Sequence, residues 1–304
     1  MGVGGRGEWG VVWYNSINVG GEMKIGILGA GAYGKALASV ARKSGNATYF
    51  YDPYKFPERK LGDVLKFSEA VVVAVPAKAL EKVLNEVSAE AKEKPFIIAT
   101  KGVMRKEVYD GFLNIEILAG PGFASEILAG KRVKLTVASE KTGENVAEKV
   151  FSSGQIVLEK TADVRGVMIL SGLKNIYAIE AGRRRLKNRS DEFREYIKNA
   201  LVESEKVLLY NGGFVETVRM SAGVGDFALT CGSERSRNYY FGKEFLRSRE
   251  RKKINEEKKR KYLKTMTVEG VFAAEEMERA EIFLPRGVEI LADILKRIRE
   301  EICH

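Results

Sequence analysis

Three glycines near the start of the chain have the spacing of a phosphate-binding loop. Residues 24–34 contain Gly29, Gly31 and Gly34 in the pattern GxGxxG, after an apolar run and before a helical pattern. Gly29 permits a tight turn, Gly31 lets the backbone approach a pyrophosphate, and Gly34 permits close helix–strand packing. The N–H groups at the start of that helix attract phosphates. In this context the motif predicts a dinucleotide site, although a lone GxGxxG also occurs in ordinary glycine-rich turns.

An acidic residue ends the next apolar run. A carboxylate at Asp52 accepts hydrogen bonds from a ribose 2′-hydroxyl and repels a 2′-phosphate, which favours NAD over NADP. Directly before Pro53, the same aspartate also fits the start of a turn. The residues leave these interpretations equal, so the predicted cofactor is NAD or NADP.

Two polar segments follow later apolar runs. Residues 99–102, Ala-Thr-Lys-Gly, place Lys101 just after a predicted strand, and ligands of open α/β sheets bind beyond the carboxyl ends of the strands. Residues 119–124 also follow a strand and include Gly120, where a backbone can come close to a ligand. We expect both segments at the substrate side of the site.

A lysine interrupts the apolar helical pattern of residues 171–179. An ammonium buried among leucine, isoleucine and tyrosine is costly unless it is paired, and Asp226 in the segment 223–231 is the partner we expect for Lys174. Such a lysine can act as a general acid or base. The alternative is a side chain that carries its ammonium to the surface.

A serine, an arginine and an asparagine follow that second segment. Arg237 offers the forked geometry that suits a phosphate, with Asn238 beside it. Ser236 is also a plausible N-cap, so the alternative is a capped helix start exposed to solvent. The residues alone do not choose between these interpretations.

The composition excludes several other chemistries. The only histidine is His304, the last residue, so a proton donor must be lysine, tyrosine or a carboxylic acid, and a histidine-rich metal centre is excluded. Cys231 and Cys303 form no CxxC pair, which fits a reducing, cytoplasmic setting and predicts no metal site. No apolar run approaches the roughly 20 residues that cross a bilayer, so we expect no membrane span.

The net charge of +10 admits nucleic acid, an anionic small molecule or simple solubility. Three arginines cluster at 183–185, and residues 247–264 mix lysine and arginine with glutamate. Mixed-sign runs of this kind are typical of a solvated helix face rather than a nucleic-acid stripe. We therefore expect a small anionic substrate and no nucleic-acid partner; a homodimer is left open.

The apolar pattern indicates how these residues are positioned. Short apolar runs alternate with amphipathic stretches up to about residue 158, which predicts βαβ units and a doubly wound parallel sheet of Rossmann type. The second half has helical periodicity and predicts an all-helical domain. The predicted strands are 25–28, 48–51, 71–75, 96–99, 115–118, 135–138 and 156–158, with helices at 35–44, 80–91, 163–182, 191–211, 236–263, 268–281 and 286–302.

The same pattern divides the chain. Residues 1–22 are rich in glycine and tryptophan without periodicity and precede a second methionine, Met23, so we interpret them as a disordered upstream extension. We expect a dinucleotide-binding domain at 23–160 and a helical substrate-binding domain at 161–304, with the ligand between them.

Seven motifs in this order resemble one known family. GAGAYG, ATKG, GPGFA, LKNIYAI, GVGDFALTC, SRNYYFG and VEG are similar to those of the NAD(P)-dependent glycerol-3-phosphate dehydrogenases, from about residue 23 onward. The resemblance implies that Lys174 is the general acid/base and that NAD or NADP carries hydride to or from the substrate. It implies a substrate pocket of Lys101, Gly120, Asp226, Thr230, Ser236, Arg237 and Asn238, and cofactor contacts from Gly29, Gly31, Ala32, Tyr33, Gly34, Asp52, Lys101, Ala124, Arg237 and Glu269.

The chain departs from the family pattern in three places. Gly122 stands where the family usually has serine or threonine, so one hydroxyl contact is missing. The segment 53–70 is much shorter than usual, which affects the adenosine pocket and the edge of the sheet. The charged run 247–264 replaces a stretch that normally contains glycines.

Two other functions fit the same residues. A related two-domain reductase of a 2-oxo acid, of the ketopantoate type, would present Arg237 to a carboxylate instead of a phosphate. A non-catalytic dinucleotide-binding protein would bind the cofactor without turnover. If the family resemblance holds, the enzyme supplies glycerol 3-phosphate for phospholipid synthesis.

Overall fold

Seven strands form a single sheet in the computed structural model, which describes residues 23–102, 105–141, 145–246 and 256–302. The strand order is β2-β1-β3-β4-β5-β6-β7. All seven predicted strands are present, and the proposed extension 1–22 lies outside the described residues. The strands are β1 (Lys24–Leu28), β2 (Ala47–Tyr51), β3 (Ala70–Val73), β4 (Pro95–Ile98), β5 (Asn114–Ala119), β6 (Val133–Ala138) and β7 (Ile156–Thr161).

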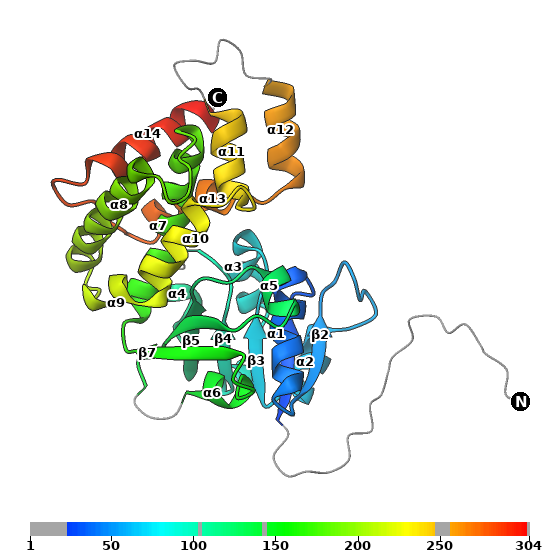
Figure 1. Cartoon of the computed structure of the whole chain (residues 1–304). Helices are drawn as coiled ribbons and strands as arrows, with labels where there is room; N and C mark the ends of the chain where they lie inside the picture. Colours follow the sequence, from blue (N-terminus) through cyan, green and yellow to red (C-terminus); the bar gives the residue numbers. More distant parts are fainter. Residues whose placement is uncertain (1–22, 103–104, 142–144, 247–255, 303–304) are drawn as a thin grey trace, which may run out of the picture.

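Alternate residues of the strands β1 to β6 enter two different cores. Val71 and Val73 pack with helices on one face, whereas Ala70 and Val72 pack with helices on the other. This explains why the inner strands are continuous apolar runs: both of their faces are buried, whereas the edge strands β2 and β7 are mostly half-buried. The helices α2 (Leu61–Phe67), α3 (Ala77–Asn85) and α4 (Lys106–Tyr109) lie on the first side, and α1 (Ala32–Lys43), α5 (Ala124–Leu128) and α6 (Val146–Val150) on the second (Figure 1).

One strand pair departs from the predicted parallel sheet. β6 runs antiparallel to β5, and β7 is parallel to β6. The connection between β5 and β6 contains only the five-residue helix α5, which spans about 7.5 Å and cannot return the chain along a whole strand. The chain therefore re-enters the sheet at the same end of the strands, and β6 runs in the opposite direction to β5.

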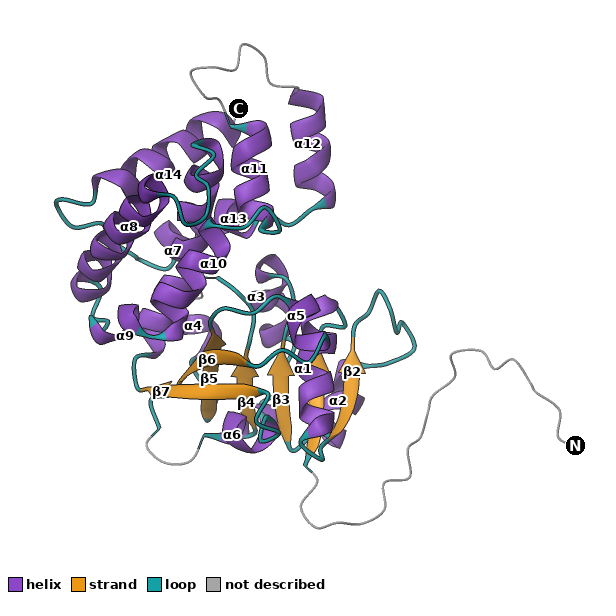
Figure 2. Ribbon diagram, in the orientation of Figure 1, coloured by secondary structure: helices purple, strands orange, loops and turns teal. Residues whose placement is uncertain are grey.

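The second half is helical, as predicted, and is built around α7 (Val164–Arg183) (Figure 2). Every residue of α7 from Gly166 to Gly182 is buried. A Cβ at Gly182 would overlap the carbonyl of Tyr239, and one at Gly242 would overlap that of Ile179, so glycine permits α11 to cross α7 backbone to backbone. The surrounding helices are α8 (Asp191–Tyr210), α9 (Glu216–Arg219), α10 (Asp226–Cys231), α11 (Arg237–Phe245), α12 (Glu256–Thr265), α13 (Glu269–Arg279) and α14 (Glu289–Ile302).

The predicted helix at 236–263 is wrong as a continuous element. Helix α11 ends at Phe245, and Leu246 is extended and buried in the helical core. Burial of this leucine ends the helix although the residues that follow have high helix propensity. Helix α12 begins at Glu256, and residues 247–255 of the charged run lie outside the described part of the chain.

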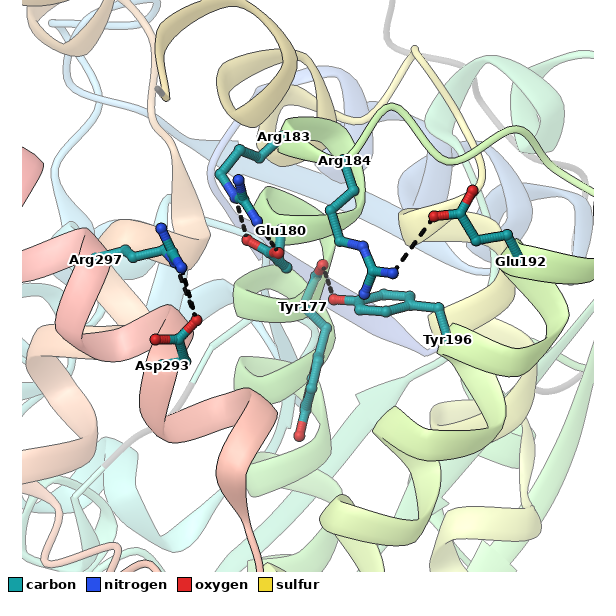
Figure 3. A network of polar contacts seen from close by, with 8 residues as sticks. All are labelled: Tyr177, Glu180, Arg183, Arg184, Glu192, Tyr196, Asp293 and Arg297. Carbon is teal, nitrogen blue, oxygen red and sulfur yellow. Dashed lines mark hydrogen bonds and ion pairs between the residues drawn. The ribbon is translucent and has the colours of Figure 1, made fainter. Parts of the chain in front are cut away.

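Polar contacts anchor the carboxyl end of α7 (Figure 3). The Tyr196 hydroxyl donates to the carbonyl oxygen of Tyr177 at 2.7 Å, and the Arg184 guanidinium lies 5.3 Å from the centre of the Tyr196 ring. Arg183 pairs with Glu180 at 2.5 Å, and Arg184 pairs with Glu192 at 3.4 Å. Two arginines of the 183–185 cluster are therefore engaged within the helical domain.

No helix in the described ranges is both long and apolar enough to cross a membrane. Within the same ranges, no three or more histidine, cysteine, aspartate or glutamate side chains are grouped to hold a metal ion.

Asp163 caps the amino end of α7 and anchors a distant loop. Its buried carboxylate accepts hydrogen bonds from Gly166 N at 2.7 Å, Phe214 N at 2.8 Å and the Thr217 hydroxyl at 2.6 Å. Asp163→Ala should lower the free energy of unfolding by about 2–4 kcal/mol, because it removes the helix cap and leaves buried hydrogen-bond donors without an acceptor. Urea unfolding followed by circular dichroism measures this loss.

Asp163→Asn is the matched control for that substitution. It keeps the oxygen that caps Gly166 N but puts an NH2 donor opposite Phe214 N, so it should lose less stability than Asp163→Ala without matching the wild-type protein. Equal losses in the two variants would show that the oxygen shared by Phe214 N and Thr217, and not the cap, holds the junction together.

Candidate active site

The glycine loop joins β1 to α1 at the carboxyl edge of the sheet. At Gly29, which has φ +102°, a Cβ would lie 2.6 Å from the Ala74 oxygen, and at Gly34 it would overlap the Gly29 oxygen. A Cβ at Gly31 would meet nothing within 4 Å, so there is free space above this residue. The first turn of α1 contains no acidic residue, and Gly31 provides no side-chain cap. These N–H groups therefore face a space that suits a pyrophosphate.

Asp52 reaches the same loop from the end of β2. Its Oδ2 accepts a hydrogen bond from Ala30 N at 2.9 Å, and its Oδ1 accepts from Tyr54 N at 3.1 Å and Lys55 N at 3.2 Å. The turn interpretation of Asp52 is therefore correct. The carboxylate also lies beside the glycine loop, where the ribose interpretation needs it.

Lys174 and Asp226 form a buried ion pair. Their side chains are 1% and 0% exposed, and the Lys174 ammonium donates directly to Asp226 Oδ2. The surface-exposed alternative for Lys174 is therefore wrong. The Thr230 hydroxyl donates to Asp226 Oδ1 at 3.2 Å, because residues four apart lie on the same face of α10.

Lys101 comes to this pair from the sheet. Its ammonium lies 5.3 Å from the centre of the Tyr33 ring, which follows the glycine loop in α1. Gly102 N donates to the Ser171 hydroxyl at 3.2 Å, which ties the strand end to α7 one turn before Lys174. Ser171 is not among the site residues predicted from the sequence; its only signal there is its position three residues before Lys174.

The loop at Gly120 also lies against the helical domain. Gly120 has φ +140°, and a Cβ at Gly225 would lie 3.0 Å from Pro121, so this loop borders the residue before Asp226. A Cβ at Gly122 would be 3.4 Å from Ile127, an ordinary contact, so the departure from serine or threonine leaves room that a side chain could fill. Ala124 begins α5 and packs against the same core as Tyr33.

Arg237 and Asn238 have different surroundings. The Arg237 side chain is 44% exposed, and its guanidinium pairs with Glu269 at 3.3 Å. Asn238 is buried: its amide donates to Asn175 Oδ1 at 2.8 Å and its carbonyl oxygen accepts from Gly270 N at 2.8 Å. The alternative of a solvated helix start is therefore wrong for Asn238. Ser236 does cap α11, since its hydroxyl accepts from Tyr239 N at 3.3 Å.

The charges of this cluster act on one another. Burial lowers the pKa of Lys174 to about 8, against the opposing effect of Asp226. Burial also acts to lower the pKa of Lys101, but the negative charges near it, Asp226 foremost, outweigh burial and raise that pKa overall. A buried lysine that titrates near neutral pH, beside a second lysine that stays charged, can exchange a proton with a ligand.

Removing Asp226 should expose the cost of burying Lys174. At pH 7, Asp226→Ala should lower the free energy of unfolding by about 3–5 kcal/mol, because the buried Lys174 must either stay charged without a partner or give up its proton. The loss should shrink toward pH 10, where Lys174 is neutral. Chemical unfolding at both pH values measures it, and the double variant Lys174→Met/Asp226→Leu should regain most of the stability. A loss independent of pH would contradict the ion-pair explanation.

Known proteins resemble this chain over most of its length. A family model described as "NAD-dependent glycerol-3-phosphate dehydrogenase C-terminus" matches residues 163–300, and the corresponding "N-terminus" model matches residues 56–145. The chain is 30% identical over 270 residues to a glycerol-3-phosphate dehydrogenase [NAD(P)+] of Brucella canis, which covers 72% of this chain and 78% of the relative. The corresponding enzyme of Teredinibacter turnerae is 27% identical over 258 residues, 73% and 76% of the two chains.

The fold has a solved counterpart. The crystal structure of a glycerol-3-phosphate dehydrogenase from Coxiella burnetii superposes with a TM-score of 0.70 at 21% identity and covers 92% of this chain and 98% of the other. Both family models match in order along the chain, and a relative that is 30% identical covers more than two thirds of it. The chain therefore belongs to the NAD(P)-dependent glycerol-3-phosphate dehydrogenase family.

Proposed function

We propose that this chain interconverts sn-glycerol 3-phosphate and dihydroxyacetone phosphate, and that Lys174 is its general acid/base. The observation that carries the assignment of Lys174 is its burial against Asp226, beside Lys101 and at the junction of the sheet with the helices. A fully buried ammonium is costly, and reaction chemistry gives a reason to keep one.

The glycine loop fits a nicotinamide dinucleotide. The space above Gly31, the uncapped start of α1 and the Asp52 carboxylate match the pyrophosphate and the adenosine ribose. When bound, NAD(P)H supplies the hydride that the C2 carbonyl carbon receives. In this proposal Ala32 and Tyr33 lie along the pyrophosphate, and Ala124, Arg237 and Glu269 lie farther along the cofactor.

Lys174 donates and accepts the proton of the substrate oxygen. During reduction its ammonium donates a proton to the oxygen on C2, and during oxidation its neutral amine accepts the proton of the C2 hydroxyl. Asp226 accepts a hydrogen bond from the Lys174 ammonium, which orients the lysine and favours its protonated form. Thr230 donates to the second oxygen of the same carboxylate. Lys101 remains charged and stabilises negative charge that develops on the same oxygen.

We assign the substrate phosphate to the position beside Arg237. The exposed fork of Arg237 provides two parallel donors, with the helix start capped by Ser236 next to it. The buried Asn238 joins α7, α11 and α13 and supports this position. Gly120 lets the loop before α5 come close to the bound molecule. Holding the phosphate fixes the C2 oxygen near Lys174.

The product suggests the wider role. A phosphorylated three-carbon alcohol is the building block of the glycerol backbone, so we infer a supply of glycerol 3-phosphate for phospholipid synthesis. The buried free thiol of Cys231 is compatible with a reducing cytoplasm. Assembly as a homodimer stays a hypothesis, as does the division into domains at 23–160 and 161–304.

Removing Lys174 should abolish most catalysis, measured at a temperature at which circular dichroism shows that the variant is folded, because the substitution leaves Asp226 buried and unpaired. With NADH or NADPH and dihydroxyacetone phosphate, the wild-type protein should consume the absorbance of the reduced nicotinamide. Lys174→Ala should lower kcat at least about 100-fold, with Lys187→Ala as an exposed-lysine control. Near-wild-type turnover of Lys174→Ala would remove it from the mechanism.

The same assay separates the alternative functions. Turnover of a 2-oxo acid alone would select the ketopantoate-type alternative, and cofactor binding with no turnover would select the non-catalytic one.

The pH dependence follows from the lowered pKa of Lys174. Reduction needs the protonated amine, so kcat/KM for dihydroxyacetone phosphate should fall as the pH rises through about 8. Oxidation needs the neutral amine, so kcat/KM for glycerol 3-phosphate should rise through the same pH. Asp226→Asn should move both midpoints to lower pH, because Asp226 favours the charged lysine. Midpoints that do not move would assign the titration to another group.

Arg237→Ala should act mainly on substrate binding. Loss of a bidentate phosphate contact should raise the KM for dihydroxyacetone phosphate by about tenfold or more, while kcat changes less. Arg235→Ala, two residues away and exposed, is the matched control and should leave KM unchanged. An unchanged KM in the Arg237 variant would place the phosphate elsewhere.

A further inference from the structure

A short π-helical turn leads into the helix that carries Asp226. It spans Ser221–Gly225, and α10 begins at Asp226 directly after it. A Cβ at Gly223 would overlap the carbonyl of Val218, so the turn folds closely back on α9. The residue before the turn, Met220, provides no side-chain cap, so the first N–H groups of the turn need acceptors from elsewhere. The position of Asp226 therefore depends on what holds this turn.

Two side chains of the sheet accept these N–H groups. Ser221 N donates to Glu159 Oε2 at 2.7 Å, and Ala222 N donates to the Thr136 hydroxyl oxygen at 3.0 Å. Thr136 on β6 and Glu159 on β7 are directly paired in these two parallel strands, so their side chains lie on the same face of the sheet. Thr136 is fully buried. The strand pair β6–β7 thus holds two consecutive residues of the turn.

Glu159 is fixed by partners at both of its oxygens. Lys134, two residues before Thr136 on β6, pairs with Glu159 Oε1 at 2.6 Å, while Oε2 accepts from Ser221 N. Burial acts to raise the pKa of Glu159, but hydrogen bonds from Lys134 and Ser221 outweigh burial and lower that pKa overall. The acceptor at Ser221 is therefore a charged carboxylate, whose hydrogen bonds are stronger than those of a neutral group.

The same strand pair leads into the helix that carries Lys174. β7 ends at Thr161, and α7 begins at Val164. Glu159 is thus connected to Lys174 through the chain and to Asp226 through the turn that it holds. Both helices that carry the ion pair are therefore anchored on β6 and β7. Because the interaction of two charges weakens with their separation, a shift of the turn would change how strongly Asp226 favours the charged form of Lys174.

We propose that Thr136 and Glu159 are positioning residues of the reaction, which hold the turn before α10 and so set the place at which Asp226 meets Lys174. The inference rests on the proposed function in taking Lys174 as the general acid/base. Both residues act through the backbone of the turn and not through a contact with substrate or cofactor. Loss of either acceptor leaves a backbone N–H without its partner, and the turn must shift to find another.

Thr136→Val tests the proposal, because it removes the acceptor with little change of shape. NMR of lysine side chains labelled with ¹³C at Cε follows the Lys174 signal, which is identified by its absence from the Lys174→Met/Asp226→Leu variant. The midpoint of its titration should move to lower pH in Thr136→Val, since a displaced Asp226 favours the charged lysine less. With dihydroxyacetone phosphate, kcat should fall about tenfold and KM should change less than about twofold. Thr136→Ser keeps the hydroxyl and should restore both the midpoint and kcat.

A matched pair of variants tests Glu159 and still decides the question if Thr136→Val does not fold. Glu159→Gln and Glu159→Leu both remove the charge, but only the leucine removes the acceptor of Ser221 N. Glu159→Leu should therefore move the Lys174 midpoint farther than Glu159→Gln does. Thr265→Val, at an exposed threonine of α12, is the control and should change neither the midpoint nor kcat.

Two results would overturn the proposal. An unchanged Lys174 midpoint in Thr136→Val, with only the free energy of unfolding lowered, would show that the hydroxyl is merely structural. Equal shifts in Glu159→Gln and Glu159→Leu would show that Glu159 acts through its charge and not through the turn. The titration needs no substrate, so failure of the wild-type protein to reduce dihydroxyacetone phosphate would contradict the proposed function and leave the positioning of the ion pair to be decided by the NMR result.

Discussion

The contact between Lys174 and Asp226 is the interaction on which the rest of the structure depends. Neither charge has access to water, so each is tolerable only while the other stays in place. The pair joins α7 to α10, and both helices must therefore be held rigidly. Asp163 fixes the amino end of α7, and Tyr177 donates to the buried carboxylate of Glu203, which in turn caps the start of α14. The stability of the helical domain and the reactivity of its lysine are thus parts of one arrangement.

The charged groups of the site come from both halves of the chain. Lys101 is supplied by the sheet, Lys174 and Asp226 by the helical domain, and Ser171 links the two through Gly102. In the proposed mechanism, proton transfer and stabilisation of negative charge are divided between two lysines whose pKa values are shifted in opposite directions. A lysine with a lowered pKa can do what histidine does in other enzymes, which fits a chain whose only histidine is its last residue.

The shortened segment after β2 forms an ordered loop at the carboxyl end of this edge strand with few residues. The chain replaces length with a stacked arginine, Arg59, a turn closed by Asp52 and a lysine, Lys55, on the glycine loop. A lysine side chain supports the end of the helix that follows: Lys94 Nζ donates to the carbonyl oxygens of Leu65 and Ser68, both at 2.7 Å, at the end of α2. Lysine side chains thus donate to backbone oxygens both at the glycine loop and at the end of α2.

The sequence by itself determined the strands, the glycine loop and the pairing of Lys174 with Asp226. These follow from local patterns: continuous apolar runs for doubly buried strands, glycine spacing for a tight turn, and one charge in an apolar helix that requires a partner. Only the tertiary structure decided the antiparallel β6, the helix end at Leu246 and the buried amide network of Asn238. Each of these depends on which distant segment lies alongside, because packing overrides local propensity and a polar side chain takes whatever partner the fold brings to it.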